Sequence, residues 1–117
     1  MGAEAIIYAA LQDLAGGNVY PDIAPEGTGK PYIVYFAVGG NSFPVLNGKT
    51  PATRNQRMRI NTWAESRLAA SELMDAVFSA VVNPSVQAVP IGGPSSTYES
   101  DTLLYGSSFD FSITYKN

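Results

Sequence analysis

The chain contains no cysteine and no histidine. Without cysteine it can form no disulfide and carries no thiolate nucleophile or thiolate metal ligand. Without histidine it lacks the side chain that most often serves as a general base near neutral pH, and also the commonest metal ligand. These two absences remove most transition-metal sites and most nucleophile–base pairs, so we expect no metal site, and an enzyme is the least favoured class of function.

Carboxylates are the remaining candidates for acid–base chemistry. Asp22 with Glu26, and Glu99 with Asp101, lie in segments rich in glycine, proline or serine, which are typical of exposed turns. A raised carboxyl pKa requires burial, which such turns do not offer, so the sequence does not favour paired-carboxylate catalysis. Residues 27–30 (GTGK) match the end of a phosphate-binding loop, but the upstream glycine is missing and a strand pattern follows instead of a helix.

Charged residues are also scarce, at 15% of the chain. Seven basic and ten acidic residues give a net charge of −3, which argues against general affinity for nucleic-acid phosphates or anionic membranes. No apolar run is long enough to span a bilayer, and the first residues lack the basic region of a secretory signal. We therefore expect a soluble, intracellular protein with no membrane partner and no specific nucleic-acid partner. The basic residues concentrate in one span, at Lys49, Arg54, Arg57, Arg59 and Arg67.

The length of 117 residues and the 45% of hydrophobic residues are typical of one globular domain, so we expect a single domain over residues 1–117. The spacing predicts a first helix over Ala3 to Leu14, because Ile7, Leu11 and Leu14 recur on one helical face. A glycine pair that favours a helix end follows after one alanine, at Gly16 and Gly17.

The clearest pattern runs from Arg57 to Val82, where a strand pattern passes into a helix pattern. Up to Trp63 the residues alternate, which predicts a strand with one apolar face and one face that carries guanidinium groups. The spacing then predicts a helix from Arg67 to Val82 that Ser66 caps. The expected apolar face of the strand holds Met58, Ile60 and Thr62. The expected apolar face of the helix holds Ala69, Leu73, Ala76, Val77 and Ala80.

Three further segments have strand character. Tyr32 to Val38 is apolar on both faces, which predicts a strand that is covered on both sides or lies at an interface. Val86 to Ile91 is short and contains a proline, which predicts an edge strand or an irregular crossover, and the glycine-rich residues 92–96 are expected to form a bend. Leu103 to Tyr115 alternates most regularly and predicts the final strand.

The expected order is helix, strand, long loop, strand, helix, weak strand and strand. Strands joined by loops favour antiparallel pairs, and two amphipathic helices need a common apolar surface to cover. We therefore predict an α+β fold, with a mostly antiparallel four-stranded sheet and two helices packed on one face.

The candidate functional residues are expected at an interface. Gly39 to Asn55 is long for a connection, and it is either a mobile hairpin loop or an arm that becomes ordered against a partner. Arg57 and Arg59 share one strand face and have three interpretations: a solvated face, pairing with Asp110 across the sheet, or contact with another subunit. The predicted interface residues are Phe43, Val45, Leu46, Arg54, Arg57 and Arg59.

Two stretches carry a resemblance to a known family. They are VYPDIAPEG followed by PYIVY, in residues 19–35, and RMRINTWAES, in residues 57–66. With the first helix that closes in a glycine pair and the alanine-rich second helix, they make the chain resemble the tail-completion, or tail-terminator, proteins of long-tailed phages and prophages. The resemblance covers nearly the whole chain, and it implies no enzymatic activity and no cofactor.

The resemblance implies a structural assembly protein. Copies of such a subunit join into a ring, expected to be a hexamer, that ends the tail tube and joins it to the head connector, although isolated subunits can be monomeric. The implied partners are further copies of the chain, the tail tube protein and the head–tail connector protein, and the implied locations are the virion tail and, during assembly, the host cytoplasm. The alternative is a small intracellular protein-binding module, an inhibitor or adaptor encoded by a prophage.

Overall fold

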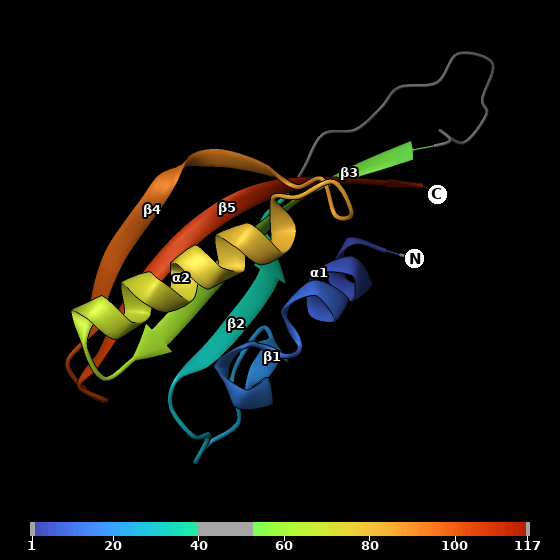
Figure 1. Cartoon of the computed structure of the whole chain (residues 1–117). Coiled ribbons are helices and arrows are strands. Elements are labelled where there is room, and N and C mark those ends of the chain that lie inside the picture. Colours follow the sequence, from blue (N-terminus) through green and yellow to red (C-terminus); the bar gives the residue numbers. More distant parts are fainter. Residues whose placement is uncertain (1, 40–52, 117) are drawn as a thin grey trace.

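The computed structural model describes residues 2–39 and 53–116. Its five strands form one sheet in the order β1-β2-β3-β5-β4, and both helices lie on one face of that sheet (Figure 1). The predicted α+β fold with both helices on one face is therefore confirmed, and the sheet has one strand more than predicted. The elements are α1 (Ala3–Leu11), the 3-10 turn η1 (Leu14–Gly17), β1 (Val19–Pro21), β2 (Tyr32–Ala37), β3 (Thr53–Ala64), α2 (Arg67–Val81), β4 (Val89–Glu99) and β5 (Leu104–Lys116).

The additional strand is β1, and it makes the sheet mixed. It runs parallel to β2, with Val19 beside Ile33 and Pro21 beside Tyr35. The prediction of a mostly antiparallel sheet is confirmed, because the other three strand pairs are antiparallel. The pair of β1 and β2 is the exception, since its connection returns along the sheet instead of making a tight turn. Both helices occupy one face of the sheet. Loop 22–31, which connects β1 to β2, runs over the opposite face, where its first residues lie beside side chains of β2 and β3. We call that second face the open face.

One hydrophobic cluster lies between the helices and the sheet. Cross-strand neighbours build its floor, since Met58 lies opposite Phe111 and Ile60 opposite Phe109. Directly opposite residues of antiparallel strands point to the same side, so the predicted alternation of β3 and β5 is confirmed. Its buried side chains include Ile7, Leu11, Ile33, Met58, Ile60, Met74, Val77, Phe109, Phe111 and Ile113.

The buried face of α2 is rotated by about one position from the predicted face. Its buried residues are Ala70, Met74, Val77 and Val81. Of the predicted face only Val77 is buried, Leu73 packs at the edge of the cluster, and Ala69 is exposed. The predicted cap is confirmed, because the Ser66 hydroxyl oxygen accepts the amide of Ala69 at 3.1 Å. An alanine-rich helix has apolar side chains on several sides, so helical spacing alone does not select the buried one.

The helix α1 ends at Leu11 instead of the predicted Leu14, which begins the turn η1. In that turn Ala15 and Gly16 have φ values of 52° and 63°. This left-handed backbone does not continue a right-handed helix. In the part of the chain that the structure describes, no helix has the length and apolarity needed to cross a membrane.

The strand β4 lies at the edge of the sheet, as one of the two interpretations of this segment expected, but it is longer. The expected bend at residues 92–96 is part of the strand, because the register with β5 shifts between Ile91 and Ser95. Such a β-bulge absorbs the extra residues, and Gly92 adopts a φ of 69° there. An edge strand tolerates a bulge and a proline, because one side of its ladder has no partner.

Candidate functional site

The open face of the sheet carries aromatic and charged side chains. The register places Phe36 of β2 opposite Arg59 of β3, and Arg59 opposite Asp110 of β5, so these three side chains share a face. The alternating residues Met58 and Ile60 point into the cluster under the helices. The basic face that the sequence predicts for β3 is therefore the open face.

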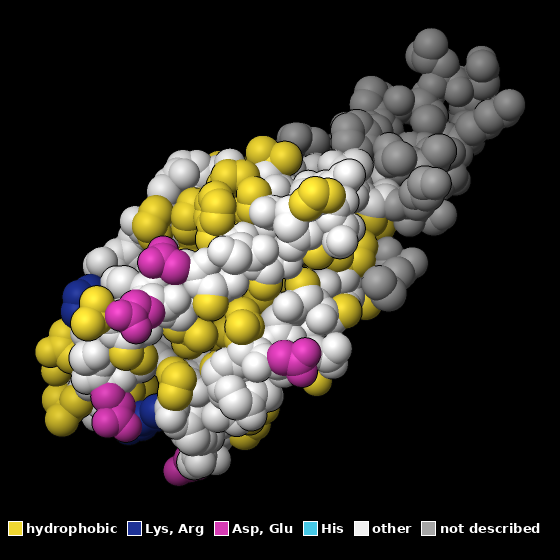
Figure 2. Space-filling view, viewed as in Figure 1, with side chains coloured by type: hydrophobic (Ala, Val, Ile, Leu, Met, Phe, Trp, Pro, Cys, Tyr) yellow, Lys and Arg dark blue, Asp and Glu magenta, His cyan; other side chains and the backbone are white. Residues whose placement is uncertain are grey.

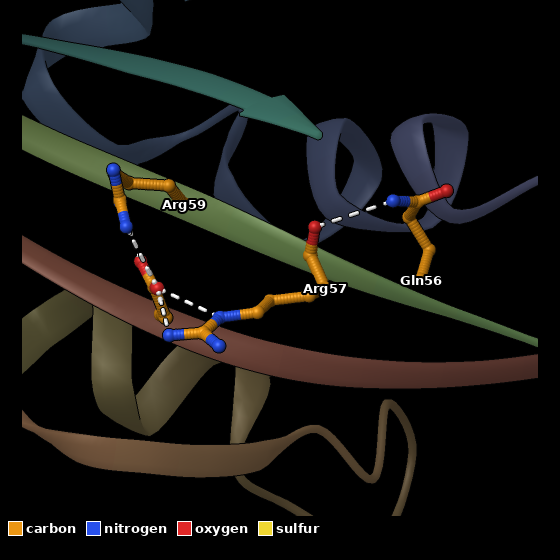
Figure 3. A network of polar contacts seen from close by, with 4 residues as sticks. Gln56, Arg57 and Arg59 are labelled. Atoms are coloured by element: carbon orange, nitrogen blue, oxygen red, sulfur yellow. Dashed lines mark hydrogen bonds and ion pairs between the residues drawn. The ribbon is translucent and has the colours of Figure 1, made fainter. Parts of the chain in front are cut away.

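Two arginines of β3 converge on one carboxylate of β5 (Figure 3). Nε and Nη2 of Arg57 lie 2.8 Å and 2.6 Å from Oδ2 of Asp110. Nε of Arg59 lies 2.7 Å from Oδ1, and its Nη2 lies 3.0 Å from Oδ2. Of the three interpretations of these arginines, the structure shows the pairing with Asp110. We call Arg57, Arg59 and Asp110 the arginine cluster.

The arginine cluster keeps a net positive charge at the surface. The side chain of Asp110 is 8% exposed, whereas those of Arg57 and Arg59 are 43% and 41% exposed. The hydrogen bond from Arg59 is the main cause that holds the pKa of Asp110 below its usual value, burial acts in the opposite direction, and a hydrogen bond from Arg57 adds to the lowering. The same hydrogen bond raises the pKa of Arg59. Two guanidinium groups share one carboxylate, so their remaining N–H groups can bind a further carboxylate.

A cleft of about 290 Å³ lies on the open face, over the strands β2 and β3. Loop 22–31 forms one side of it with Asp22, and Glu99 at the end of β4 lines it as well. Its aromatic lining comes from Tyr32, Phe36 and Trp63 of β2 and β3. No local sequence pattern predicts this cleft, because it depends on the loop that returns over the open face. The one available signal was the apolar pattern on both faces of β2.

Trp63 packs over Gly106 on the open face, and this contact leaves no room for a side chain. A Cβ atom at position 106 would lie 2.8 Å from the indole ring and closer still to the hydroxyl of Thr97. We expect Gly106→Ala to displace Trp63 and to lower the free energy of unfolding by about 1–3 kcal/mol. Urea denaturation followed by the fluorescence of Trp63, the single tryptophan, measures both effects.

Gly93→Ala is the matched control for Gly106→Ala. Gly93 lies in the neighbouring strand β4, and a Cβ atom there would meet nothing within 4 Å. We expect its stability to stay within about 0.5 kcal/mol of the unchanged chain. Equal stability of the two variants would contradict the packing described for Trp63.

Comparison with known proteins decides the family. The family model described as "Tail completion protein gp17" matches residues 7–116. The chain belongs to this tail completion family. The resemblance inferred from residues 19–35 and 57–66 is therefore confirmed. No curated protein sequence matches the chain.

Solved structures show the same fold as this member of the tail completion family. A chain from the virion of a native gene transfer agent particle aligns with a TM-score of 0.67 and 15% identity, over 98% of this chain and 95% of that chain. The gp17 protein of bacteriophage SPP1 aligns with a TM-score of 0.55 and 15% identity, over 97% of this chain and 88% of that chain. At such identities the likeness concerns the fold alone.

The structure brings only some of the predicted interface residues together. Arg57 and Arg59 are neighbours in the arginine cluster. Arg54 lies opposite Tyr115 near the start of β3, and the alternation of the strand places it on the other face from Arg57 and Arg59. The three apolar residues of the predicted arm lie outside the described residues, and so does most of Gly39 to Asn55. They are Phe43, Val45 and Leu46.

Arg67, the fourth basic residue on or near β3, is bound to the backbone of β4 and β5. Its guanidinium group donates hydrogen bonds of 2.6 Å to the carbonyl oxygens of Gly106 and Thr97. It also lies over the ring of Tyr105, 5.4 Å from the centroid. Arg67 therefore ties the first turn of α2 to the connected ends of β4 and β5. We call this end of the sheet, with residues 97–106, the hairpin end.

Proposed function

We propose that the chain is a structural assembly protein of a phage or prophage tail, and that its copies form a hexameric ring that ends the tail tube and joins it to the head connector. Membership of the tail completion family supports a role in tail assembly. The observation that carries the self-association is the arginine cluster, which stays partly exposed on a sheet face that no described helix covers. We also propose that the chain is not an enzyme, that it is assembled in the host cytoplasm and that it acts in the virion tail.

The hairpin end is the second contact surface in this proposal. Leu103 and Tyr98 expose 66% and 51% of their surface there, and Glu99 and Asp101 lie exposed beside them. Figure 2 shows exposed apolar side chains near this end of the molecule, at the lower left, with acidic and basic side chains beside them. Exposed apolar groups with acidic neighbours suit a basic partner surface. A contact between the arginine cluster of one copy and the hairpin end of the next is head-to-tail, and it closes a ring only at a fixed rotation.

Electron microscopy tests the ring. We expect closed rings of the purified chain at high concentration, and a ring at the head-proximal end of tail tubes assembled in its presence. Since subunits that resemble this one can be monomeric when isolated, the tails decide the question. Tails of normal length that join heads without this chain would overturn the proposal. Capture of one host protein by the monomer, with no effect on tails, would favour the prophage-encoded inhibitor or adaptor instead.

Arg57 is the residue of the arginine cluster that best tests the interface. Arg59 contacts both oxygens of Asp110, whereas Arg57 contacts only Oδ2. Replacement of Arg57 therefore leaves Asp110 neutralised. We expect Arg57→Gln to change the free energy of unfolding by at most about 1 kcal/mol, as for an exposed ion pair, and to abolish rings and tail completion.

Two further variants control this experiment. Arg57→Lys keeps the positive charge but loses the planar fork, so we expect it to retain part of the assembly. Glu72→Gln changes a charge on the exposed surface of α2, and it should assemble normally. Normal rings formed by Arg57→Gln would show that the arginine cluster serves the fold and not the interface.

A further inference from the structure

The cleft on the open face combines aromatic side chains with carboxylates. Tyr32, Phe36 and Trp63 contribute three rings, and Asp22 and Glu99 contribute two negative charges. Aromatic faces attract cations, and carboxylates accept strong hydrogen bonds from guanidinium groups. None of the described residues that line the cleft is a lysine or an arginine. The cleft therefore has the chemistry of a cation receptor and holds no cation of its own.

Asn61 adds an unused hydrogen-bond acceptor to the cleft. Its side chain lines the cleft, and its Oδ1 atom is buried without a hydrogen-bond donor among the described residues. Folded proteins rarely leave a buried acceptor without a donor. A ligand that brings N–H groups into the cleft would supply that donor.

Glu99 is held where its charge acts on the cleft. Its Oε1 atom accepts a hydrogen bond of 2.7 Å from the hydroxyl of Thr102, which orients the carboxylate. Burial and, to a smaller extent, the charge of Glu99 raise the pKa of Tyr32, one of the lining rings. A cation in the cleft would therefore lie near both the negative charge and the ring.

We propose that the cleft binds an arginine side chain of a second copy of the chain. Its volume of about 290 Å³ suits one side chain, since pockets for drug-sized ligands start near about 300 Å³. Guanidinium fits better than ammonium, because a planar group with five donors stacks on rings and reaches the acceptors of Asp22, Asn61 and Glu99. Arg57 is a better candidate than Arg59, because it contacts only Oδ2 of Asp110, whereas Arg59 contacts both carboxylate oxygens.

The binding of an arginine side chain does not depend on the proposed function, but the choice of a second copy as its source does. Fluorescence of Trp63 tests the first part directly. The probe is N-acetyl-arginine amide, and N-acetyl-citrulline amide at equal ionic strength is the neutral control of the same shape. We expect a saturable change with the arginine compound and at least about tenfold weaker binding of the citrulline compound.

Variants locate the binding in the cleft. Glu99→Gln keeps the shape of the side chain and should weaken binding of the arginine compound about tenfold. Asp75→Asn removes an exposed charge on α2, on the other side of the sheet from the cleft, and should leave binding unchanged. Equal responses to arginine and citrulline, or full binding by Glu99→Gln, would overturn the receptor.

A mixing experiment tests the second copy. Arg57→Gln lacks the arginine but keeps the cleft, and Glu99→Gln keeps the arginine but has a weakened cleft. We expect each variant alone to be monomeric, and an equal mixture to form heterodimers in analytical ultracentrifugation, at a concentration where the unchanged chain forms rings. Rings of normal yield from Glu99→Gln alone, or a mixture without heterodimers, would overturn the self-contact and leave the tail role standing. Arginine binding with no assembly of the unchanged chain, either in solution or at the end of tail tubes, would overturn the ring and the choice of partner, but not the receptor.

Discussion

Met74→Ala is expected to lower the free energy of unfolding by about 2–5 kcal/mol. Met74 is 3% exposed and lies in the cluster between α2 and the sheet. Its truncation removes buried apolar surface and leaves a cavity that the close-packed surroundings fill only in part. Urea denaturation at neutral pH measures the loss.

Leu73→Ala is the matched control for Met74→Ala. Leucine and methionine have similar helix propensities, so both changes affect the backbone of α2 alike. Leu73 packs only at the edge of the cluster, and we expect a loss of about 1 kcal/mol. The face predicted from helical spacing requires the reverse order, with Leu73 in the core. A larger loss for Leu73→Ala would restore that prediction and contradict the observed rotation of α2.

Local patterns were sufficient for most helices and strands and for placing both helices on one face, but insufficient for the pairing of the strands. The alternation of β3 and the Ser66 cap need only neighbouring residues, and both are confirmed. The parallel pairing of β1 depends on the path of loop 22–31 over the open face, which no local pattern contains. The bulge in β4 likewise depends on its pairing with β5, and glycine-rich residues 92–96 alone favour a bend.

For the candidate site, the sequence predicted which residues share a strand face but not which residues of other strands they contact. Alternation placed Arg57 and Arg59 together on one face, but the choice of Asp110 as their partner depends on the register of β3 with β5. Asn61 and Glu99 are far apart in the sequence and both line the cleft because the strands carry them there. Spacing along the chain carries no information on such a meeting of distant residues.

Asp110→Asn is expected to lower the free energy of unfolding by about 1.5–3 kcal/mol at pH 7, the range for hydrogen bonds to charged groups. The asparagine keeps the size of the side chain but leaves Arg57 and Arg59 without their shared negative charge. Asp110 is 6% exposed, so water replaces the lost interactions only in part. Asp75→Asn, at an exposed position of α2, is the control and should change stability by less than about 0.5 kcal/mol.

Acid should remove this difference between the unchanged chain and Asp110→Asn. The pKa of Asp110 is lowered in the folded chain, so its contribution is fully present above the unfolded value of about 3.9. It is lost as the pH falls through the lower folded value, because the carboxyl group then gains a proton in both states. Urea denaturation at pH 7, 5 and 3 should give equal differences at the first two values and a smaller one at pH 3. A difference that does not change with pH would show that the charge of Asp110 contributes nothing.

A double-mutant cycle between Asp110 and each arginine should then separate the two contacts. Arg59 makes two hydrogen bonds, one to each carboxylate oxygen, and its hydrogen bond is the main cause of the lowered pKa of Asp110. Arg57 contacts only the oxygen that it shares with Arg59. We therefore expect the coupling of Asp110→Asn with Arg59→Gln to exceed its coupling with Arg57→Gln. The reverse order would make Arg57 the structural partner of Asp110, and Arg59 would then be the arginine that is available to a neighbouring copy.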